Sequence, residues 1–344
     1  MYLVTGGSGF IGAALVRRLR AAGAAVRIMD LRPPADIPES EMQAGRLEYL
    51  RGDVTSSADV VRALRGVNCV FHLAAQMLLS LGGSEMHRVN VQGTQMVLEA
   101  ARRAEVNKVV YVSTAMLCGS SPGRPTREDD PPAPSGPYAV SKIDAELVCR
   151  EYLARGMEIA ILRPLFVLGR GRLGLLHLLF DRVQRGRPLY LVGGGRNRFH
   201  MIGVDDLAEA CVLASAAGHR GVFNVGVENP TPVRTQMEAL RDHAGTATRI
   251  RPLPVWLVRA AVKVLSLLRL SPIQEEQQKV AWQDRVLDTT RARRELGWTH
   301  TRSDVELLLE TYDWYQIAKT QPRDHASDWP DGGVLKWKWI DRFL

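Results

Sequence analysis

The stretch MYLVTGGSGFIGAALVRRLRAAGAAVRIMD, residues 1–30, decides the fold class. It opens on apolar residues typical of a buried strand and continues through a glycine-rich segment. Apolar residues then recur at helical spacing up to Gly23, and a second apolar run ends at Asp30. The pattern predicts strand, tight turn, amphipathic helix and strand, which is the first unit of a parallel α/β sheet.

The glycines of this turn have the spacing G-x-x-G-x-x-G, at Gly6, Gly9 and Gly12. Glycine lets a backbone turn tightly, approach a pyrophosphate and pack a helix on its strand. Asp30 lies about 20 residues on, where a carboxylate accepts hydrogen bonds from the ribose hydroxyls of adenosine. That carboxylate would repel a 2′-phosphate, so NAD is expected rather than NADP, although Arg32 leaves room for both. An ordinary glycine-rich loop is the alternative interpretation.

Later segments extend this predicted nucleotide site. YLRGDV, residues 49–54, ends a strand at Asp53, which is placed to accept from an adenine amino group. VFHLAA, residues 70–75, brings two small alanines to a strand end. An amphipathic helix is expected to open near Asn90, and KVVYVSTAMLCG, residues 108–119, predicts a buried strand. Each segment is also compatible with plain strand-and-turn sequence.

Composition excludes several classes of protein. The 344 residues suit one large α/β domain with a smaller lobe, and the formal charge of +8 is scattered, without the basic runs of nucleic-acid binders. The cysteines stand far apart, so neither a disulfide framework nor a metal site is indicated and a reducing cytoplasm is expected. They are Cys69, Cys118, Cys149 and Cys211.

Membrane insertion is not expected. The first strand begins at Tyr2, which leaves no room for a secretory signal, and no apolar run reaches the roughly 20 residues of a membrane span. PVWLVRAAVKVLSLLRLSP, residues 254–272, comes nearest but carries Arg259, Lys263 and Arg269. We expect a packed helix there, with contact at a membrane interface as the alternative.

Nine short motifs, in order, make a resemblance specific. They are TGGSGFIG (5–12), GDV (52–54), HLAA (72–75), NVQGT (90–94), VSTAMLCG (112–119), YAVSK (138–142), ILRP (161–164), GVDDLAEA (203–210) and FNVG (223–226). Over about residues 1–315 the chain resembles the extended short-chain dehydrogenase/reductase family, in its NAD-dependent epimerase/dehydratase branch. The resemblance implies a Rossmann-type doubly wound parallel sheet, a smaller mixed α/β carboxyl-terminal substrate lobe, and NAD.

The resemblance also implies a division of the chain. It assigns residues 1–165 and 200–227 to the NAD-binding domain, 166–199 and 228–320 to an interleaved substrate lobe, and 321–344 to a tail. A helix around residues 174–185 and a hairpin near Gly193 to Gly195 would face the substrate. Asp206 is expected to be the N-cap of a helix that returns to the first domain. Helices near 92–104 and 139–153 resemble those that pair across a family homodimer.

The motif YAVSK puts Tyr138 and Lys142 one helical turn apart. An ammonium beside a phenol favours the phenolate, so Lys142 is expected to lower the pKa of Tyr138. The resemblance implies that Tyr138 is the general base and that Lys142 also holds the nicotinamide ribose. It implies that Thr114 forms a hydrogen bond with the reacting oxygen of the substrate. An exposed helix pair and a plain strand-end hydroxyl are the alternatives.

The resemblance places the cofactor contacts at Gly6, Gly9, Phe10, Ile11, Gly12, Asp30, Arg32, Asp53, Val54, Ala74, Ala75, Asn90, Tyr138, Lys142 and Pro164. The expected substrate contacts are Thr114, Phe166, Arg196 and Arg198.

Several departures from the family pattern concern the substrate. Pro164-Leu165-Phe166 stands where sugar-nucleotide epimerases often carry an asparagine, and Phe199 stands where their diphosphate-binding arginine is counted, with Arg196 and Arg198 as nearby substitutes. Cys118 replaces a common tyrosine.

Ala115 and Met116 follow the catalytic threonine, where the 4,6-dehydratases of the family carry an acid pair. Two apolar residues cannot transfer protons, so dehydration by that route is disfavoured.

The leading hypothesis is therefore a nucleotide-sugar epimerase, acting at C4 through a transient keto intermediate. The alternative is an NAD(P)-dependent dehydrogenase or reductase of an apolar alcohol or ketone, resembling 3β-hydroxysteroid dehydrogenases and dihydroflavonol reductases. In that case residues 254–272 and the tail GGVLKWKWIDRFL, 332–344, would help admit a lipid-like substrate. A non-catalytic NAD-binding protein is a third class, which the presence of Thr114, Tyr138 and Lys142 together disfavours.

Overall fold

A computed structural model describes residues 1–35, 37, 46–77, 83–121, 123–134, 136–174, 176–267 and 281–320. Its larger part is built on a seven-stranded parallel sheet with the order β10-β6-β5-β4-β1-β2-β3. The strands are β1 (Tyr2–Thr5), β2 (Val26–Asp30), β3 (Leu47–Arg51), β4 (Cys69–His72), β5 (Lys108–Val112), β6 (Ile159–Arg163) and β10 (Gly221–Asn224). The expected doubly wound Rossmann-type sheet is confirmed.

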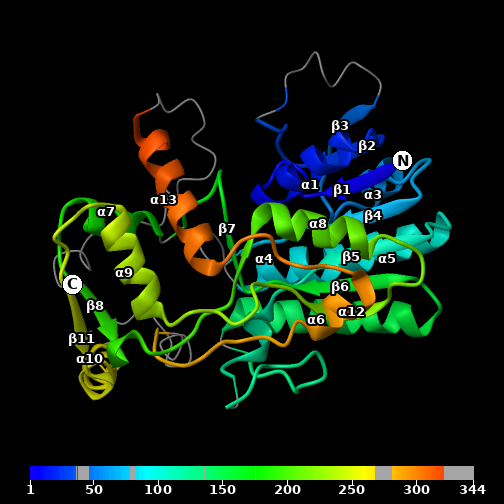
Figure 1. Cartoon of the computed structure of the whole chain (residues 1–344). Coiled ribbons are helices and arrows are strands. Elements are labelled where there is room, and N and C mark those ends of the chain that lie inside the picture. The colour runs from blue at the N-terminus through cyan, green and yellow to red at the C-terminus, as the bar shows by residue number, and fades with distance from the viewer. Residues whose placement is uncertain are drawn as a thin grey trace.

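Helices cover both faces of this sheet (Figure 1). On one face α1 (Phe10–Ala21) packs against α8 (Val204–Ala214), and the other face carries α3 (Ser57–Ala63), α5 (Gly93–Arg103) and α6 (Pro137–Ala154). The strands inside the edge strand β3 are almost wholly buried, because a parallel sheet covered on both sides leaves neither face to solvent.

The connections reverse direction at β1, which pairs with β2 on one side and with β4 on the other. Thr5, the last residue of β1, is in register with Met29 and with His72. The carboxyl ends of neighbouring strands therefore meet at one edge, on both sides of the reversal. Open α/β sheets bind their ligands outside this edge.

A smaller lobe lies beside the sheet (Figure 1). Its core joins α7 (Leu176–Gln184), α9 (Val233–His243) and α13 (Asp304–Thr320) to the parallel pair β8 (Leu189–Val192) and β11 (Ile250–Leu253). A second short pair, β7 (Phe166–Leu168) and β9 (Met201–Gly203), connects the two parts. The other short helices are α4 (Gly83–His87), η1 (Arg88–Gln92), η2 (Ala115–Cys118) and η3 (Gly193–Gly195).

One segment departs from the expected division of the chain. Helix α12 (Thr290–Leu296) packs on α8 and β10, and Ala292, Leu296 and Trp298 belong to the core of the larger domain. The indole of Trp298 donates to the main-chain oxygen of Asp206 at 2.9 Å. The chain thus returns to the first domain once more before α13.

The expectation that Asp206 is a helix N-cap is wrong. Gly203 precedes the first residue of α8, and no side chain caps that helix. The Asp206 carboxylate is buried and accepts hydrogen bonds from the main-chain N and Oγ1 of Thr301, at 3.2 and 2.8 Å. It therefore ties α8 to the segment that follows α12.

The expectation of a packed helix at residues 254–272 is also wrong for the part described. In helix α10 (Val255–Leu267) most of the described side chains are exposed, and Trp256 keeps 70 % of its surface. Residues 268–272 and the tail 321–344 lie outside the described residues. Among those that are described, no helix combines the length and the apolar character needed to cross a membrane.

Candidate active site

The glycine-rich turn lies at the reversal point of the sheet. Gly6 has φ of +71°, and a Cβ added to it would come within 2.7 Å of the main-chain nitrogen of Ala74. At Gly12 a Cβ would lie 2.2 Å from the oxygen of Gly6, whereas at Gly9 the same distance is 3.3 Å. Gly6 and Gly12 are thus required by the fold itself, and Gly9 is the glycine left to admit a close ligand. Phe10 and Ile11 begin α1 directly after it.

Asp30 ends β2 beside this turn. One carboxylate oxygen accepts from the main-chain nitrogen of Ser8 at 3.1 Å, and the other accepts from that of Arg32 at 3.3 Å. The Ser8 hydroxyl in turn donates to the main-chain oxygen of Arg32 at 2.7 Å. The two predicted residues therefore lie together at the turn, with the Arg32 side chain exposed. A carboxylate held here is placed to meet an adenosine ribose.

Asp53 and Val54 follow β3 at the same edge of the sheet. The Asp53 carboxylate accepts from the main-chain nitrogen of Thr55 at 2.8 Å, which shapes the turn into α3. Val54 is buried against the first residue of α5, Gly93, where a Cβ would come within 2.8 Å of it. Ala75 is exposed in the loop after β4.

Asn90 holds that loop against α6. Its amide nitrogen donates to the oxygen of Gln76 at 3.0 Å and to the hydroxyl of Ser141 at 2.9 Å, and its amide oxygen accepts from the nitrogen of Gln76 at 2.7 Å. The Ser141 hydroxyl donates to the main-chain oxygen of Tyr138 at 2.8 Å. Asn90 lies in the π-helical turn η1, not in α5 as expected, and its side chain positions other residues.

A buried histidine beneath the edge was not singled out from the sequence. The ring nitrogens of His72 lie 2.7 Å from Oγ1 of Thr5 and 3.0 Å from Oγ1 of Thr94. Burial lowers the pKa of His72 to about 3, so the ring is neutral. It joins β1, β4 and α5 and supplies no charge.

Thr114 follows β5, near the middle of the sheet. It is buried, and its Oγ1 accepts from the main-chain nitrogen of Met116 at 3.2 Å as the cap of η2. Its hydroxyl hydrogen remains available for a substrate oxygen. Pro164, at the end of the neighbouring strand, accepts from the nitrogen of Ala115 at 2.8 Å and so fixes the same turn.

Tyr138 and Lys142 lie in the first turns of α6, which begins with Pro137. The Lys142 ammonium is 1 % exposed, donates to the oxygen of Val112 at 2.9 Å and lies 4.3 Å from the centre of the Tyr111 ring. Burial lowers the pKa of Lys142 to about 8.

Burial raises the pKa of Tyr138 to about 12. The expected lowering of that pKa by Lys142 is therefore wrong for this structure, because burial outweighs every charge near the phenol. The one charge that lowers the pKa belongs to Arg172, on the loop after β7. The sequence carried a weak signal for it, two arginines that alternate with two glycines at residues 169–172.

Helix α6 is fixed to the sheet one turn beyond Lys142. Glu146 and Arg163, both almost fully buried, form a two-pronged ion pair with N···O distances of 2.9 and 2.5 Å. Such paired hydrogen bonds set orientation as well as distance. The pair holds the turn of α6 that carries Lys142 against the end of β6.

The predicted substrate residues have different surroundings. Phe166 is 40 % exposed and packs edge-on against Phe199, with ring centres 5.0 Å apart. Phe199 is buried with Ala115, Leu165 and Leu287. An apolar wall therefore stands beside Thr114, at the position where an arginine was counted.

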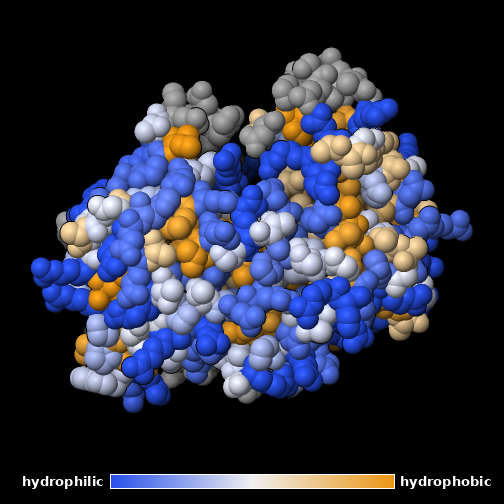
Figure 2. Space-filling view, in the orientation of Figure 1, coloured by the Kyte–Doolittle hydropathy of each residue, from blue (hydrophilic) through white to orange (hydrophobic). Residues whose placement is uncertain are grey.

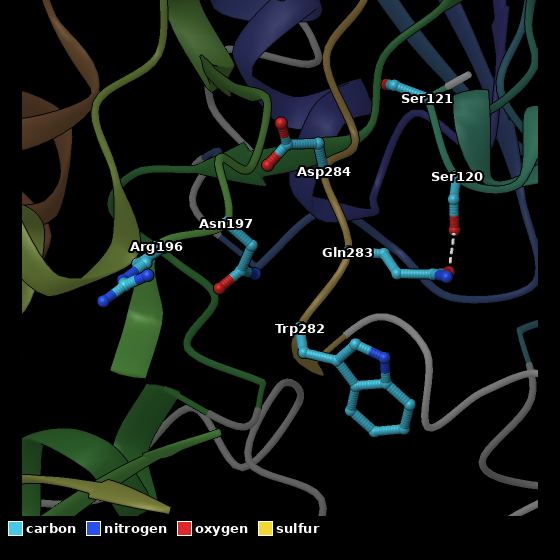
Figure 3. Close-up of a pocket in the computed structure, with 7 residues that line it drawn as sticks. All are labelled: Ser120, Ser121, Arg196, Asn197, Trp282, Gln283 and Asp284. Atoms are coloured by element: carbon cyan, nitrogen blue, oxygen red, sulfur yellow. Dashed lines mark hydrogen bonds between the residues drawn. The ribbon is translucent and has the colours of Figure 1, made fainter. Parts of the chain in front are cut away.

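A polar pocket of about 440 Å³ lies next to this wall (Figure 3). Its lining is Ser120, Ser121, Arg196, Asn197, Trp282, Gln283 and Asp284. Arg196 is part of the lining and Arg198 is not; the main-chain nitrogen of Arg198 donates to the Asp284 carboxylate at 2.7 Å. Asn197 has a buried amide oxygen without a hydrogen-bond partner among the described residues. Trp282, Gln283 and Asp284 were not predicted.

The described residues contain no group of three or more His, Cys, Asp or Glu side chains that could hold a metal ion.

Known proteins share this sequence and this fold. The uncharacterized protein y4nG of Sinorhizobium fredii is 34 % identical over 91 % of this chain and 78 % of its own length. A UDP-glucose 4-epimerase of Mycolicibacterium smegmatis is 30 % identical over 91 % of this chain and 98 % of its own length. The structure of DesIV, a dTDP-glucose 4,6-dehydratase of Streptomyces venezuelae with NAD and TYD bound, superposes with a TM-score of 0.74 and 28 % identity, over 92 % of this chain and 97 % of that one.

Further matching relatives include a ketoreductase and sterol dehydrogenases. The activities of the relatives thus span epimerases, dehydratases and dehydrogenases. The family itself matches over residues 2–226. The chain belongs to the NAD dependent epimerase/dehydratase family and is an NAD-dependent enzyme of the extended short-chain dehydrogenase/reductase type.

Proposed function

We propose that this enzyme is a nucleotide-sugar epimerase that acts at C4 through a transient keto sugar. The observation that carries the proposal is the polar pocket beside the Thr114 turn. Its size suits a small ligand, its lining is mainly hydrogen-bonding, and Trp282 offers an aromatic face to a base. Ala115 and Met116 carry no proton-transfer group, which argues against dehydration.

The proposed roles follow from the positions of the side chains. Thr114 donates its hydroxyl hydrogen to the substrate oxygen, and Tyr138 takes the proton of the C4 hydroxyl and later returns it. The Lys142 ammonium holds the nicotinamide ribose, and NAD, when bound, accepts and returns the hydride. Tyr138 can take that proton only as the phenolate, and burial raises the pKa of the phenol to about 12, so the phenolate has to be stabilised by positive charge beside it. Arg172 is the charge nearby that favours the phenolate.

The cofactor would be held by the glycine turn, Asp30 and the loop that Asn90 fixes. A Cβ added at Gly9 would meet only the Gly6 oxygen, at 3.3 Å, so the backbone is open to a pyrophosphate there. We propose NAD as the preferred form, because the Asp30 carboxylate is fixed by two main-chain nitrogens where a 2′-phosphate would meet it.

The apolar wall favours a second candidate. Phe166, backed by the buried Phe199, presents aromatic surface near Thr114, which suits net oxidation or reduction of an apolar alcohol or ketone. That function would leave the neighbouring polar pocket without a ligand group to bind, so we rank it second.

Deuterium placed at C4 of UDP-glucose and dTDP-glucose separates the candidates. An epimerase should give the C4 epimer with the deuterium still on C4 and without net formation of NADH. Deuterium in a C6 methyl group would mean dehydration. Stoichiometric NADH, or turnover only with apolar ketones, would exclude the epimerase.

We also propose a homodimer. Val140 and Leu147, seven residues apart on α6, are 44 % and 53 % exposed, which leaves an apolar strip on that helix for a second copy. Light scattering should return twice the chain mass, and a Leu147→Glu variant should return the mass of one chain. The four buried, unpaired thiols suit a reducing compartment such as the cytoplasm.

A further inference from the structure

Helix α10 and the strand before it form a distinct surface at the end of the smaller lobe farthest from the seven-stranded sheet (Figure 1). Trp256 is 70 % exposed and Leu257 is 43 % exposed, and Ala260 and Ala261 are exposed as well. Val255 and Val258 are the more covered residues of this helix. Soluble proteins rarely expose such a group of apolar residues together, so these residues indicate a surface that binds a partner.

Unpaired positive charge surrounds this helix. Arg249, Arg251, Arg259 and Lys263 are exposed, and none of them has an ion-pair partner in the part of the chain that the structure describes. Residues 243–274 include five lysines or arginines and no aspartate or glutamate, whereas the whole chain carries 45 basic and 37 acidic residues. This part of the sequence is therefore more basic than the chain as a whole.

The charges and the apolar residues share one side of α10. Arg259 and Lys263 are one turn apart, and Trp256 precedes Lys263 by two turns. Tryptophan is enriched where a protein meets the boundary between lipid and water, because its ring is apolar and its N–H still finds water. Lysine and arginine extend from such a helix to lipid phosphates.

We infer that α10 docks this enzyme on the surface of an anionic lipid bilayer, with Trp256 and Leu257 at the level of the headgroups and Arg259 and Lys263 on lipid phosphates. The inference is independent of the substrate proposed above. The helix begins at the pocket wall, because a Cβ at Gly193 would lie 3.4 Å from Val255 and 3.5 Å from Trp282. A lipid surface bound to α10 would therefore lie close to the hairpin that carries Arg196 and Asn197.

Figure 2 shows the face of the molecule seen in Figure 1, a mainly hydrophilic surface in which apolar side chains lie in several separate groups. The control variants below test whether exposed charges or apolar residues away from α10 bind lipid as well.

Co-sedimentation of the full chain with vesicles tests the inference. Vesicles of phosphatidylcholine containing phosphatidylglycerol should bind the protein, vesicles of phosphatidylcholine alone should not, and added salt should release it. The double variant Arg259→Gln, Lys263→Gln should bind roughly thirtyfold more weakly, at about fivefold for each charge lost. Trp256→Ser should weaken binding on the order of tenfold.

Matched controls remove the same charge or the same apolar exposure elsewhere. Arg17→Gln with Arg294→Gln deletes two exposed cations of the larger domain, and Ile317→Ser removes a side chain that is 54 % exposed on α13. Both should bind the vesicles as the unmodified chain does. Equal weakening by the Arg17 and Arg294 pair would mean attraction by net charge alone and would overturn the assignment.

Two further results would also overturn it. One is vesicle binding that the α10 variants leave unchanged. The other is a change of molecular mass in light scattering of the α10 variants without vesicles, because the helix would then be a contact between protein chains. Thermal unfolding of each variant verifies that its fold is retained.

Discussion

The residues that form the glycine turn lie close together in the sequence, whereas the residues that form the polar pocket come from distant parts of it. The turn, Asp30 and the loop at Ala74 all come from the first 75 residues, and their contacts are largely between main-chain atoms. The pocket draws on residues 120–121, 196–197 and 282–284, which belong to three separate segments. A site made of backbone depends on glycine and strand ends, whereas a site made of distant side chains can change its ligand without changing the fold.

Loss of the Tyr138 phenol should have the largest effect on turnover, because the proposed base acts on the ligands that both regions bind. Tyr138→Phe retains the ring and its packing, so turnover should fall on the order of a hundredfold to ten-thousandfold, while NAD affinity and thermal stability remain. Steady-state rates and NAD titration measure this. Tyr2→Phe, at the opposite edge of the sheet, is the matched control. An unchanged rate for the Tyr138 variant would refute its role as the base.

Glycine substitutions test whether the turn depends on backbone space. Gly12→Ala places a methyl group 2.2 Å from the Gly6 oxygen, so α1 must move away from the turn. The free energy of unfolding should fall by about 1–3 kcal/mol, as in other overpacked sites, and NAD affinity should fall with it. Gly9→Ala, at 3.3 Å, should unfold close to the normal temperature and still bind NAD poorly. Equal melting temperatures for both variants would contradict the distinction.

Arginine substitutions test the side-chain site. Arg196 lines the pocket and Arg198 does not, so Arg196→Gln should raise the KM for a nucleotide sugar about tenfold, the scale of one charged hydrogen bond. Arg198→Gln is the matched control and should leave KM unchanged. Neither variant should alter NAD affinity. A larger effect at Arg198 would show that the ligand occupies a different surface.

Asp30→Ala tests cofactor choice. NAD should bind the unmodified enzyme more tightly than NADP, and the variant should narrow that preference by several fold, because the charge that opposes a 2′-phosphate is gone. Isothermal titration with both cofactors measures the ratio. Stronger binding of NADP by the unmodified enzyme would contradict the assignment.

Lys142 should give the smallest effect, a pH dependence of stability. Its folded pKa of about 8 lies below the ordinary value of 10.5, so the unfolded chain binds more protons between those two pH values. Stability contributed by this group therefore rises with pH across that window. At pH 7 the charged lysine opposes folding, and by pH 10.5 it no longer does.

The difference between Lys142→Met and the unmodified enzyme isolates this contribution. The advantage of the methionine variant in melting temperature should shrink by a few degrees from pH 8 to pH 10.5. A difference that stays constant across this range would mean that Lys142 titrates normally. Deprotonation of Lys142 should also weaken NAD binding by the unmodified enzyme above about pH 8. The Lys142→Met variant should not show this change with pH.

The sequence by itself determined the sheet, the glycine turn and the choice of residues that we propose for the reaction centre. Alternating strand and helix patterns specify a parallel sheet, and the carboxyl ends of its strands must then meet, which brings Gly6, Asp30 and Thr114 to one edge. Helical periodicity similarly fixes Tyr138 and Lys142 on one side of α6. These conclusions are local, because they depend on residues close together in the chain.

Only the tertiary structure decided what surrounds those residues. Burial raises the pKa of Tyr138, the charge of Arg172 on another loop lowers it by less, and Asp206 binds Thr301 instead of capping its helix. The same holds for α10, where the apolar sequence predicts a packed helix although the fold leaves Trp256 and Leu257 exposed. Desolvation and packing depend on every element nearby, and so they are set by contacts between segments far apart in the sequence.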